Sequence, residues 1–145
     1  MELSEGKIQQ FFHRIDSLVL EQEPLFGKMN ANQMICHCTD QIRMAIGTKN
    51  ATVEGKVDPN EIIAMAKSGK SVPTPKGLGQ VEGDGTKPTT LERDKKILKE
   101  HILNFSKLDD NFGYASHPYF EQMDKKQWTA LVIYHLNHHL KQFNV

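Results

Sequence analysis

The sequence has little cysteine, no excess of charge of either sign and no long apolar run. Its 18 basic residues balance 18 acidic residues, which argues against a surface that coats nucleic acid. No apolar run is longer than that from Ala130 to Tyr134, which is far shorter than the roughly 20 residues that cross a bilayer, and the first residues lack the layout of a signal peptide. These absences predict a soluble, cytoplasmic protein with neither nucleic acid nor membrane as a partner.

Cysteine is limited to Cys36 and Cys38. In a helix this spacing points the two side chains about 200° apart, so they cannot form a disulfide with each other, and we expect a reducing compartment. Cys38 is expected on the inward side of its helix, where a small buried hydrophobe is the favoured interpretation and a soft metal ligand the alternative. Cys36 is expected to be peripheral.

Apolar residues recur at helical intervals in five segments, and no segment alternates with the period of a strand. The predicted helices run from about Ser4 to Leu20, from Ala31 to Gly47 behind an Asn30 cap, from Pro59 to Gly69 behind an Asp58 cap, from a Thr89–Glu92 capping box to about Lys107, and from Lys125 to Gln142 behind Asp124. This pattern predicts one all-α domain over residues 1–145, a four-helix bundle with a short extra helix.

The segment from Gly69 to Pro88 differs from the rest of the chain. It holds five of the ten glycines and three of the six prolines and has no periodic apolar pattern. We therefore expect a long connection without regular structure, either a lid over the bundle or slack chain.

Histidine is the residue type that calls for a chemical explanation. On a helical wheel His135 and His139 lie at the centre of the apolar face of the last helix, and His138 lies at its margin. His37 lies on the flank of the apolar face of the second helix. Antiparallel packing of these two helices brings His37, His135 and His139 to the same depth, which predicts one divalent metal, Zn, Ni or Fe, held by three imidazoles.

Neighbouring residues limit the chemistry of such a site. Leu136 occupies the position where zinc proteases have glutamate, so peptide hydrolysis is disfavoured. Asp40 is a candidate acceptor for the imidazole of His37, with a solvated surface carboxylate as the alternative. Gln142 either reaches a metal-bound water or closes the helix end, His138 is the third candidate neighbour of the ligands, and no general base is visible.

Three stretches carry a family resemblance: Met29 to Asp40, His117 to Trp128 and His135 to Phe143. They resemble the DinB-like superfamily, and more closely a branch catalogued as a domain of unknown function. The resemblance implies a four-helix bundle of up-down-down-up topology and a divalent metal on His37, His135 and His139. Some members are transferases that use bacillithiol, mycothiol or related low-molecular-weight thiols. Asn137 stands where an aspartate is expected in close relatives.

Two hypotheses of different class follow. The first is a metal-dependent thiol S-transferase that acts on a small-molecule substrate. The second is a non-catalytic metal- or ligand-binding helical bundle, such as a stress-related interaction protein or a homodimer, in which the histidines are structural. An open coordination position at the metal would favour the first.

Overall fold

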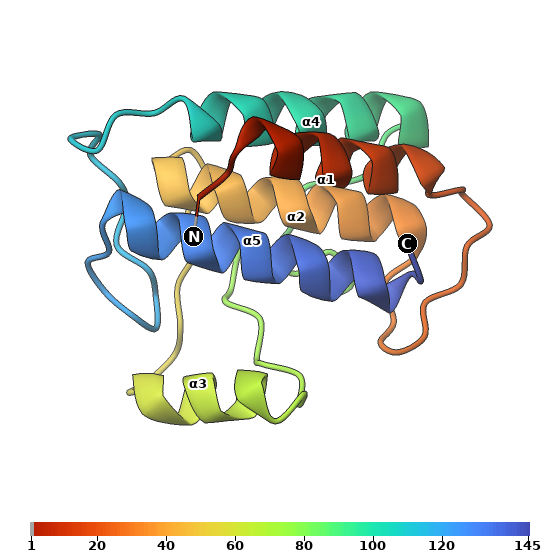
Figure 1. Cartoon of the computed structure of the whole chain (residues 1–145). Coiled ribbons are helices and arrows are strands. Elements are labelled where there is room, and N and C mark those ends of the chain that lie inside the picture. The colour runs from red at the N-terminus through yellow and green to blue at the C-terminus, as the bar shows by residue number, and fades with distance from the viewer. Residues whose placement is uncertain (1) are drawn as a thin grey trace.

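The structure, a computed structural model, describes residues 2–145. This part of the chain is all-helical and contains no β-strand element, which confirms the predicted all-α class. The helices, shown in Figure 1, are α1 (Glu5–Ser17), α2 (Ala31–Ile46), α3 (Pro59–Lys67), α4 (Leu91–Ser106) and α5 (Lys125–Gln142). No helix within residues 2–145 is long and apolar enough to cross a membrane.

The four longer helices pack against one another. Both α1 and α2 contact α4 and α5. In Figure 1, α1 and α5 run from left to right, whereas α2 and α4 run from right to left. Hydrogen bonds agree with these directions: the N–H of Ala115, ahead of α5, donates to the carbonyl of Ala45 near the end of α2 (2.9 Å). At the first turns of α2 and α4, the side-chain amide of Asn32 donates to Asp94 (3.3 Å).

Local capping explains where the two site-bearing helices begin. Asn30 and Gln33 exchange hydrogen bonds as a capping box at the start of α2, and Asp124 and Gln127 do the same at the start of α5. Gly47 ends α2 with a left-handed φ of 84°, a conformation that favours glycine. The sequence predicted these three signals correctly.

Two helix ends differ from the sequence-based expectation. The N-cap of α4 is Thr90, whose side chain accepts from the N–H of Arg93. Thr89 instead binds Asp94 with both its N–H (2.8 Å) and its hydroxyl (2.7 Å), so the proposed Thr89 capping box is wrong by one residue. The first helix also ends at Ser17, three residues before the expected end.

A single hydrophobic core lies among the four longer helices. Its largest fully buried side chains come from α1, α2, α4 and α5 and from the segments beside them: Trp128, Phe105, Phe143, Ile15, Leu18, Met34, Ile35, Ile42, Leu98, Ile102, Leu136 and Leu140. None of these comes from α3, which stands apart from the other helices in Figure 1 and joins them through two extended connections.

Candidate functional site

The last two-thirds of α5 and the first half of α2 bring three histidines together. The candidate ligand nitrogens of His37, His135 and His139 all lie within 4.8 Å of one another. The Nε2 atoms of His37 and His135 are 3.0 Å apart. His37 and His139 are buried and His135 is partly buried. These residues, the three-histidine cluster, are the same three that the helical wheel selected.

Hydrogen bonds define the tautomers of two members of the cluster. Nδ1 of His37 lies 2.7 Å from the carbonyl oxygen of Leu78, which can only accept, so Nδ1 carries the proton. Nδ1 of His139 lies 2.7 Å from Oε1 of Gln142. The amide nitrogen of Gln142 donates to the carbonyl of Phe26 (2.8 Å), which establishes that Oε1 is the acceptor for His139. In both neutral rings Nε2 therefore carries the lone pair, as in metal-bound histidines, and that of His37 lies 3.0 Å from Nε2 of His135.

The environment keeps all three imidazoles uncharged. Burial lowers the pKa of His37 and lowers the pKa of His139 to about 3. For His135, burial first and then the neighbouring imidazoles hold the pKa well below its usual value. At neutral pH the cluster consists of uncharged nitrogen donors, the protonation state that metal binding requires.

The carboxylate of Asp40 is fully buried and binds the connection between α3 and α4. It accepts from the side-chain amide of Gln80 (2.7 Å), from the N–H of Thr86 (2.8 Å) and from the hydroxyl of Thr86 (2.6 Å). Arg43 donates to the same carboxylate (3.3 Å). Asp40 is therefore neither a surface carboxylate nor a direct acceptor for a ligand imidazole, but a latch that holds residues 80–86 on α2.

The contacts of Asp40 position the hydrogen-bond acceptor of His37. The sequence had suggested Asp40 itself for that role. Leu78, whose carbonyl orients the ring of His37, lies two residues before the latched segment 80–86. The amide of Gln80 packs on the backbone of Gly85, where a Cβ would lie 2.4 Å from the amide nitrogen. The sequence carries no signal for a backbone carbonyl in an irregular segment, so this partner of His37 was missed.

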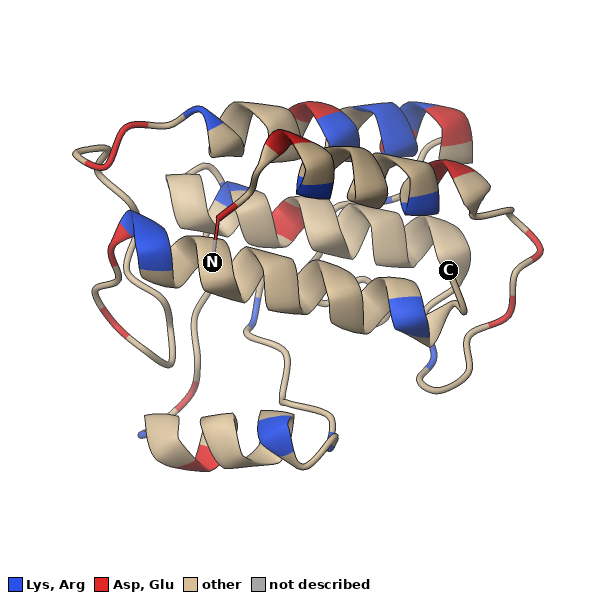
Figure 2. Cartoon of the chain, viewed as in Figure 1, with Lys and Arg blue, Asp and Glu red and all other residues tan. Residues whose placement is uncertain are grey.

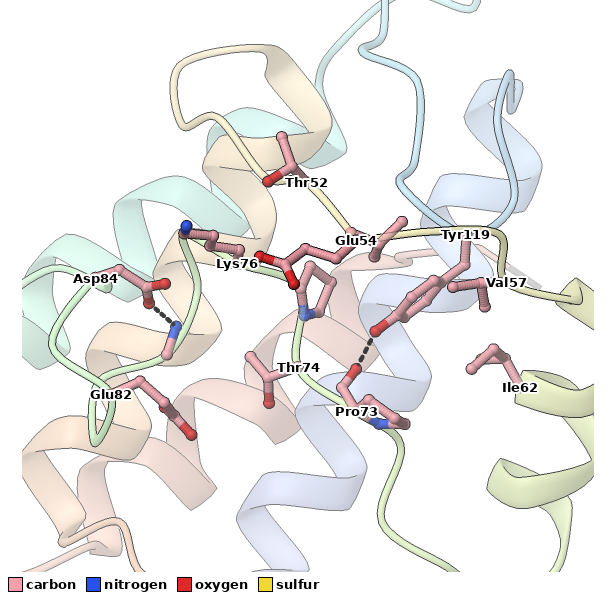
Figure 3. Close-up of a pocket in the computed structure, with 13 residues that line it drawn as sticks. Thr52, Glu54, Val57, Ile62, Pro73, Thr74, Lys76, Glu82, Asp84 and Tyr119 are labelled. Carbon is pink, nitrogen blue, oxygen red and sulfur yellow. Dashed lines mark hydrogen bonds between the residues drawn. The ribbon is translucent and has the colours of Figure 1, made fainter.

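Residues 69–88 form neither a helix nor a strand element, as expected from their glycine and proline content. They are nevertheless held at several points, so slack chain is the wrong description. Asp84 accepts from the N–H groups of Gly77 and Gly79 (both 2.9 Å), which lower the pKa of its carboxyl. The hydroxyl of Tyr119 donates to the carbonyl of Pro73. Figure 3 shows the Tyr119–Pro73 contact and one of the two Asp84 contacts among residues that line a cavity of about 430 Å³ beside the segment.

A larger cavity of about 610 Å³ shares part of this lining and reaches the three-histidine cluster. Its walls come from α2, α3, α5, the loop before α2 and residues 70–82. His138 lies in this wall rather than in the cluster, with its ring stacked on Tyr134 (6.0 Å between centroids) and tilted against Phe26 (5.4 Å). The structure thus places His138 in the cavity wall, and the cavity gives the cluster access to small molecules.

His117 organises the loop before α5, as the sequence indicated. Its Nδ1 accepts from the N–H of Tyr119 (2.9 Å), and its ring packs near Phe120 and Trp128. Burial lowers the pKa of His117 to about 4. The ring also lines the larger cavity, so this histidine forms part of the wall of the site.

Neither cysteine belongs to the cluster. Cys38 is buried in the core, where its thiol contacts the sulfur of Met34 (3.7 Å), and burial raises its pKa. Cys36 is also buried, so the expectation that it is peripheral is wrong. Burial, reinforced by Asp94, raises the pKa of Cys36 to about 12. Both thiols are protonated at neutral pH and remain outside the cavity wall.

Comparison with known proteins adds a family but no reaction. A family model described as "Protein of unknown function (DUF1569)" matches residues 1–145. No curated protein matches the chain, and no solved structure matches it. These comparisons therefore assign no reaction to this chain.

Proposed function

The chain belongs to the DUF1569 family of proteins of unknown function, and we propose that it is a divalent-metal-binding protein in which His37, His135 and His139 hold the ion. The tautomers of His37 and His139 are the main observation in support of this proposal. Two of the three rings commit Nδ1 to a fixed acceptor and present Nε2 to the same small space. The Nε2 atoms of His37 and His135 already lie 3.0 Å apart, and one cation could bind the uncharged nitrogens of all three rings at once.

The donor set fits a transition metal. Imidazole nitrogen binds Zn, Ni and Fe, at about 2.0–2.1 Å in the case of zinc. In a tetrahedral site two nitrogens at that bond length lie about 3.3 Å apart. The Nε2 atoms of His37 and His135 are 3.0 Å apart and all ligand nitrogens lie within 4.8 Å of one another, so small side-chain rotations are enough to close the site. Three neutral ligands leave the charge of a bound +2 ion uncompensated, which favours binding and deprotonation of a thiol.

We further propose the DinB-like, up-down-down-up bundle as the fold. The support is the direction of the four longer helices: α1 and α5 run one way, and α2 and α4 run the other way. In such a bundle α2 and α5 are antiparallel, which agrees with the matched depth of the three histidines.

The cavity supports small-molecule chemistry at this site. Structural zinc sites are closed by four protein ligands, whereas catalytic sites have three and an open position. Here three histidines lie at the wall of a cavity of about 610 Å³, a size typical of small-molecule sites. We therefore favour a metal-dependent transferase acting on a small molecule, with a low-molecular-weight thiol as the nucleophile, over a purely structural metal.

Metal content tests the proposal directly. Protein purified without a histidine tag or chelator is expected to contain close to one equivalent of Zn, Ni or Fe by elemental analysis. His139→Ala should lose most of it, because one of three ligands is removed. His101→Ala is the matched control, since His101 bonds the carbonyl of Ile97 within α4 (2.8 Å) and does not line the cavity. Equal metal in wild type and His139→Ala would refute the assignment.

Activity requires a separate test. The metal-loaded protein is assayed with a panel of low-molecular-weight thiols, each in the presence of electrophilic acceptors. It should transfer at least one of these thiols to an acceptor, and His135→Ala should not. Casein and plasmid cleavage are the counter-assays. Turnover absent across the whole panel would favour the non-catalytic bundle, and histidine-dependent cleavage of casein or plasmid would overturn both hypotheses.

A further inference from the structure

The larger cavity gathers exposed apolar side chains. Among residues 2–145, eight large hydrophobic side chains are exposed, and four of them line this cavity: Phe26, Ile63, Val81 and Tyr134. Exposed apolar side chains scattered singly need no explanation, but a cluster around a concave site indicates an apolar ligand.

The helix α3 supplies a second, independent indication. It has only nine residues, and Ile62 is its only buried side chain. An isolated helix of this length is not stable in water, so most of its stability has to come from packing. Yet Ile62, Ile63 and Ala66 line the cavity, and α3 meets α5 through the hydroxyl of Tyr134, which donates to the carbonyl of Ala66 (3.5 Å). An apolar ligand would complete the packing of this helix.

The charges around the cavity specify the ligand further. Its lining includes three cations, Lys28, Lys67 and Lys70, and a single carboxylate, Glu82. Lys67 ends α3, and Lys70 follows it closely, whereas Lys28 belongs to the loop before α2. Figure 2 shows that the charge of the molecule is dense along α4, while the middle of α5, which forms the floor of the cavity, carries none. An uncharged floor with cations at its edge fits a ligand with an apolar body and an anionic end.

We propose that this cavity binds an amphipathic anion, with its apolar body between α3 and α5 and its anionic group at Lys67 and Lys70. The inference names the ligand class of the proposed metal site and rests on that function, because both use the same cavity. The volume of about 610 Å³ accommodates a molecule well beyond the size of an eight-carbon chain.

Three probes with a chain of eight carbons test the charge: octanoate, 1-octanol and octyltrimethylammonium, titrated calorimetrically into the whole protein. We expect octanoate to bind most tightly and the ammonium least. In Lys67→Gln/Lys70→Gln the affinity for octanoate should fall by about three- to tenfold, in keeping with partly exposed charge pairs, while octanol stays within twofold. Lys96→Gln/Lys107→Gln, which removes two cations from outside the cavity, should change neither the affinity for octanoate nor that for octanol.

The apolar part has its own variants. Ile63→Ser should weaken octanoate and octanol together, whereas Leu103→Ser, an exposed apolar position on α4 outside the cavity, should weaken neither. Amide hydrogen exchange in α3 should slow when octanoate binds, because the ligand completes the packing of that helix. Equal binding of the three probes, or unchanged exchange in α3 at saturation, would overturn the inference.

His135→Ala separates this inference from the proposed function. If octanoate binds the lysine edge, its affinity in His135→Ala should stay within threefold of wild type. Binding that is lost in His135→Ala but is indifferent to the lysine substitutions would place the carboxylate on the metal and overturn the inference while supporting the metal. If the protein binds octanoate but takes up no Zn, Ni or Fe even after incubation with them, the cavity takes this ligand independently of a metal and the proposed function is refuted.

Discussion

Replacing Gln142 by methionine should weaken metal binding without touching a ligand. The side chain of Gln142 makes two buried hydrogen bonds: it accepts from Nδ1 of His139 (2.7 Å) and donates to the carbonyl of Phe26 (2.8 Å). Methionine has a similar length and neither group. In the variant, the proton of His139 is free to move to Nε2, the atom that faces the rest of the cluster, and a metal then has to displace it.

The magnitude follows from the role of such partners. Loss of a hydrogen bond to the far nitrogen of a ligand histidine typically costs 10- to 100-fold in metal affinity, which corresponds to about 1.4–2.7 kcal/mol. The fold should also lose about 2 kcal/mol, because two buried hydrogen bonds each contribute about 1 kcal/mol. The affinity loss is measured on folded protein, so this second cost does not enter it.

Competition with a chromophoric zinc chelator at neutral pH measures the affinity. The matched control is Gln41→Met, since Gln41 is buried and lines the same cavity but makes no hydrogen bond to the cluster within the described chain. Gln41→Met should bind zinc within about threefold of wild type. If folded Gln142→Met also does so, the tautomer argument is refuted.

Three further predictions concern the surroundings of the cluster. Burial lowers the pKa of His117 to about 4, so between pH 6.5 and pH 4 its imidazole binds a proton in the unfolded chain but not in the folded chain. The free energy of unfolding therefore decreases as the pH is lowered, by about 2 kcal/mol from pH 7 to pH 5. His117→Asn retains an acceptor without the titration, and urea unfolding of chelator-treated protein should show a loss smaller by that amount; equal losses would contradict this. Asp40→Asn places an amide nitrogen against hydrogen-bond donors and should lower the free energy of unfolding by about 3 kcal/mol. Limited proteolysis at residues 77–86 should also become faster, and an unchanged rate of cleavage there would contradict the prediction. In Gly85→Ala the new Cβ would lie 2.4 Å from Nε2 of Gln80, so the thermal midpoint should fall well below that of Gly113→Ala, where the Cβ meets open space; equal midpoints would disprove the close approach.

The sequence predicted the parts of the molecule that depend on helical periodicity. Five helices, the caps of α2 and α5 and the inward direction of His37, His135 and His139 follow from spacing alone, because a helix repeats its faces regularly. Antiparallel packing of α2 and α5 then leaves little choice about which side chains meet. The cap of α4 was misplaced because Thr89 and Thr90 are equally good caps, and only the buried Asp94 decides between them.

The direction of Asp40 could not be predicted in the same way. Its position one turn after His37 is compatible with a bond to the ring, with solvent and with a distant segment. The choice depends on Gln80 and Thr86, which lie about 40 residues away in the sequence, and no local pattern encodes that contact.

The connection between α3 and α4 shows why composition misled on rigidity. Glycine and proline are typical of flexible chain, yet here they permit close packing around a buried carboxylate. Gly77 has a φ of 110°, and a Cβ there would lie 2.2 Å from the carbonyl oxygen of Asn50. Gly85 lets the amide of Gln80 reach Asp40. The residues that look like slack in the sequence are therefore the ones that let an irregular segment deliver the carbonyl of Leu78 to the three-histidine cluster.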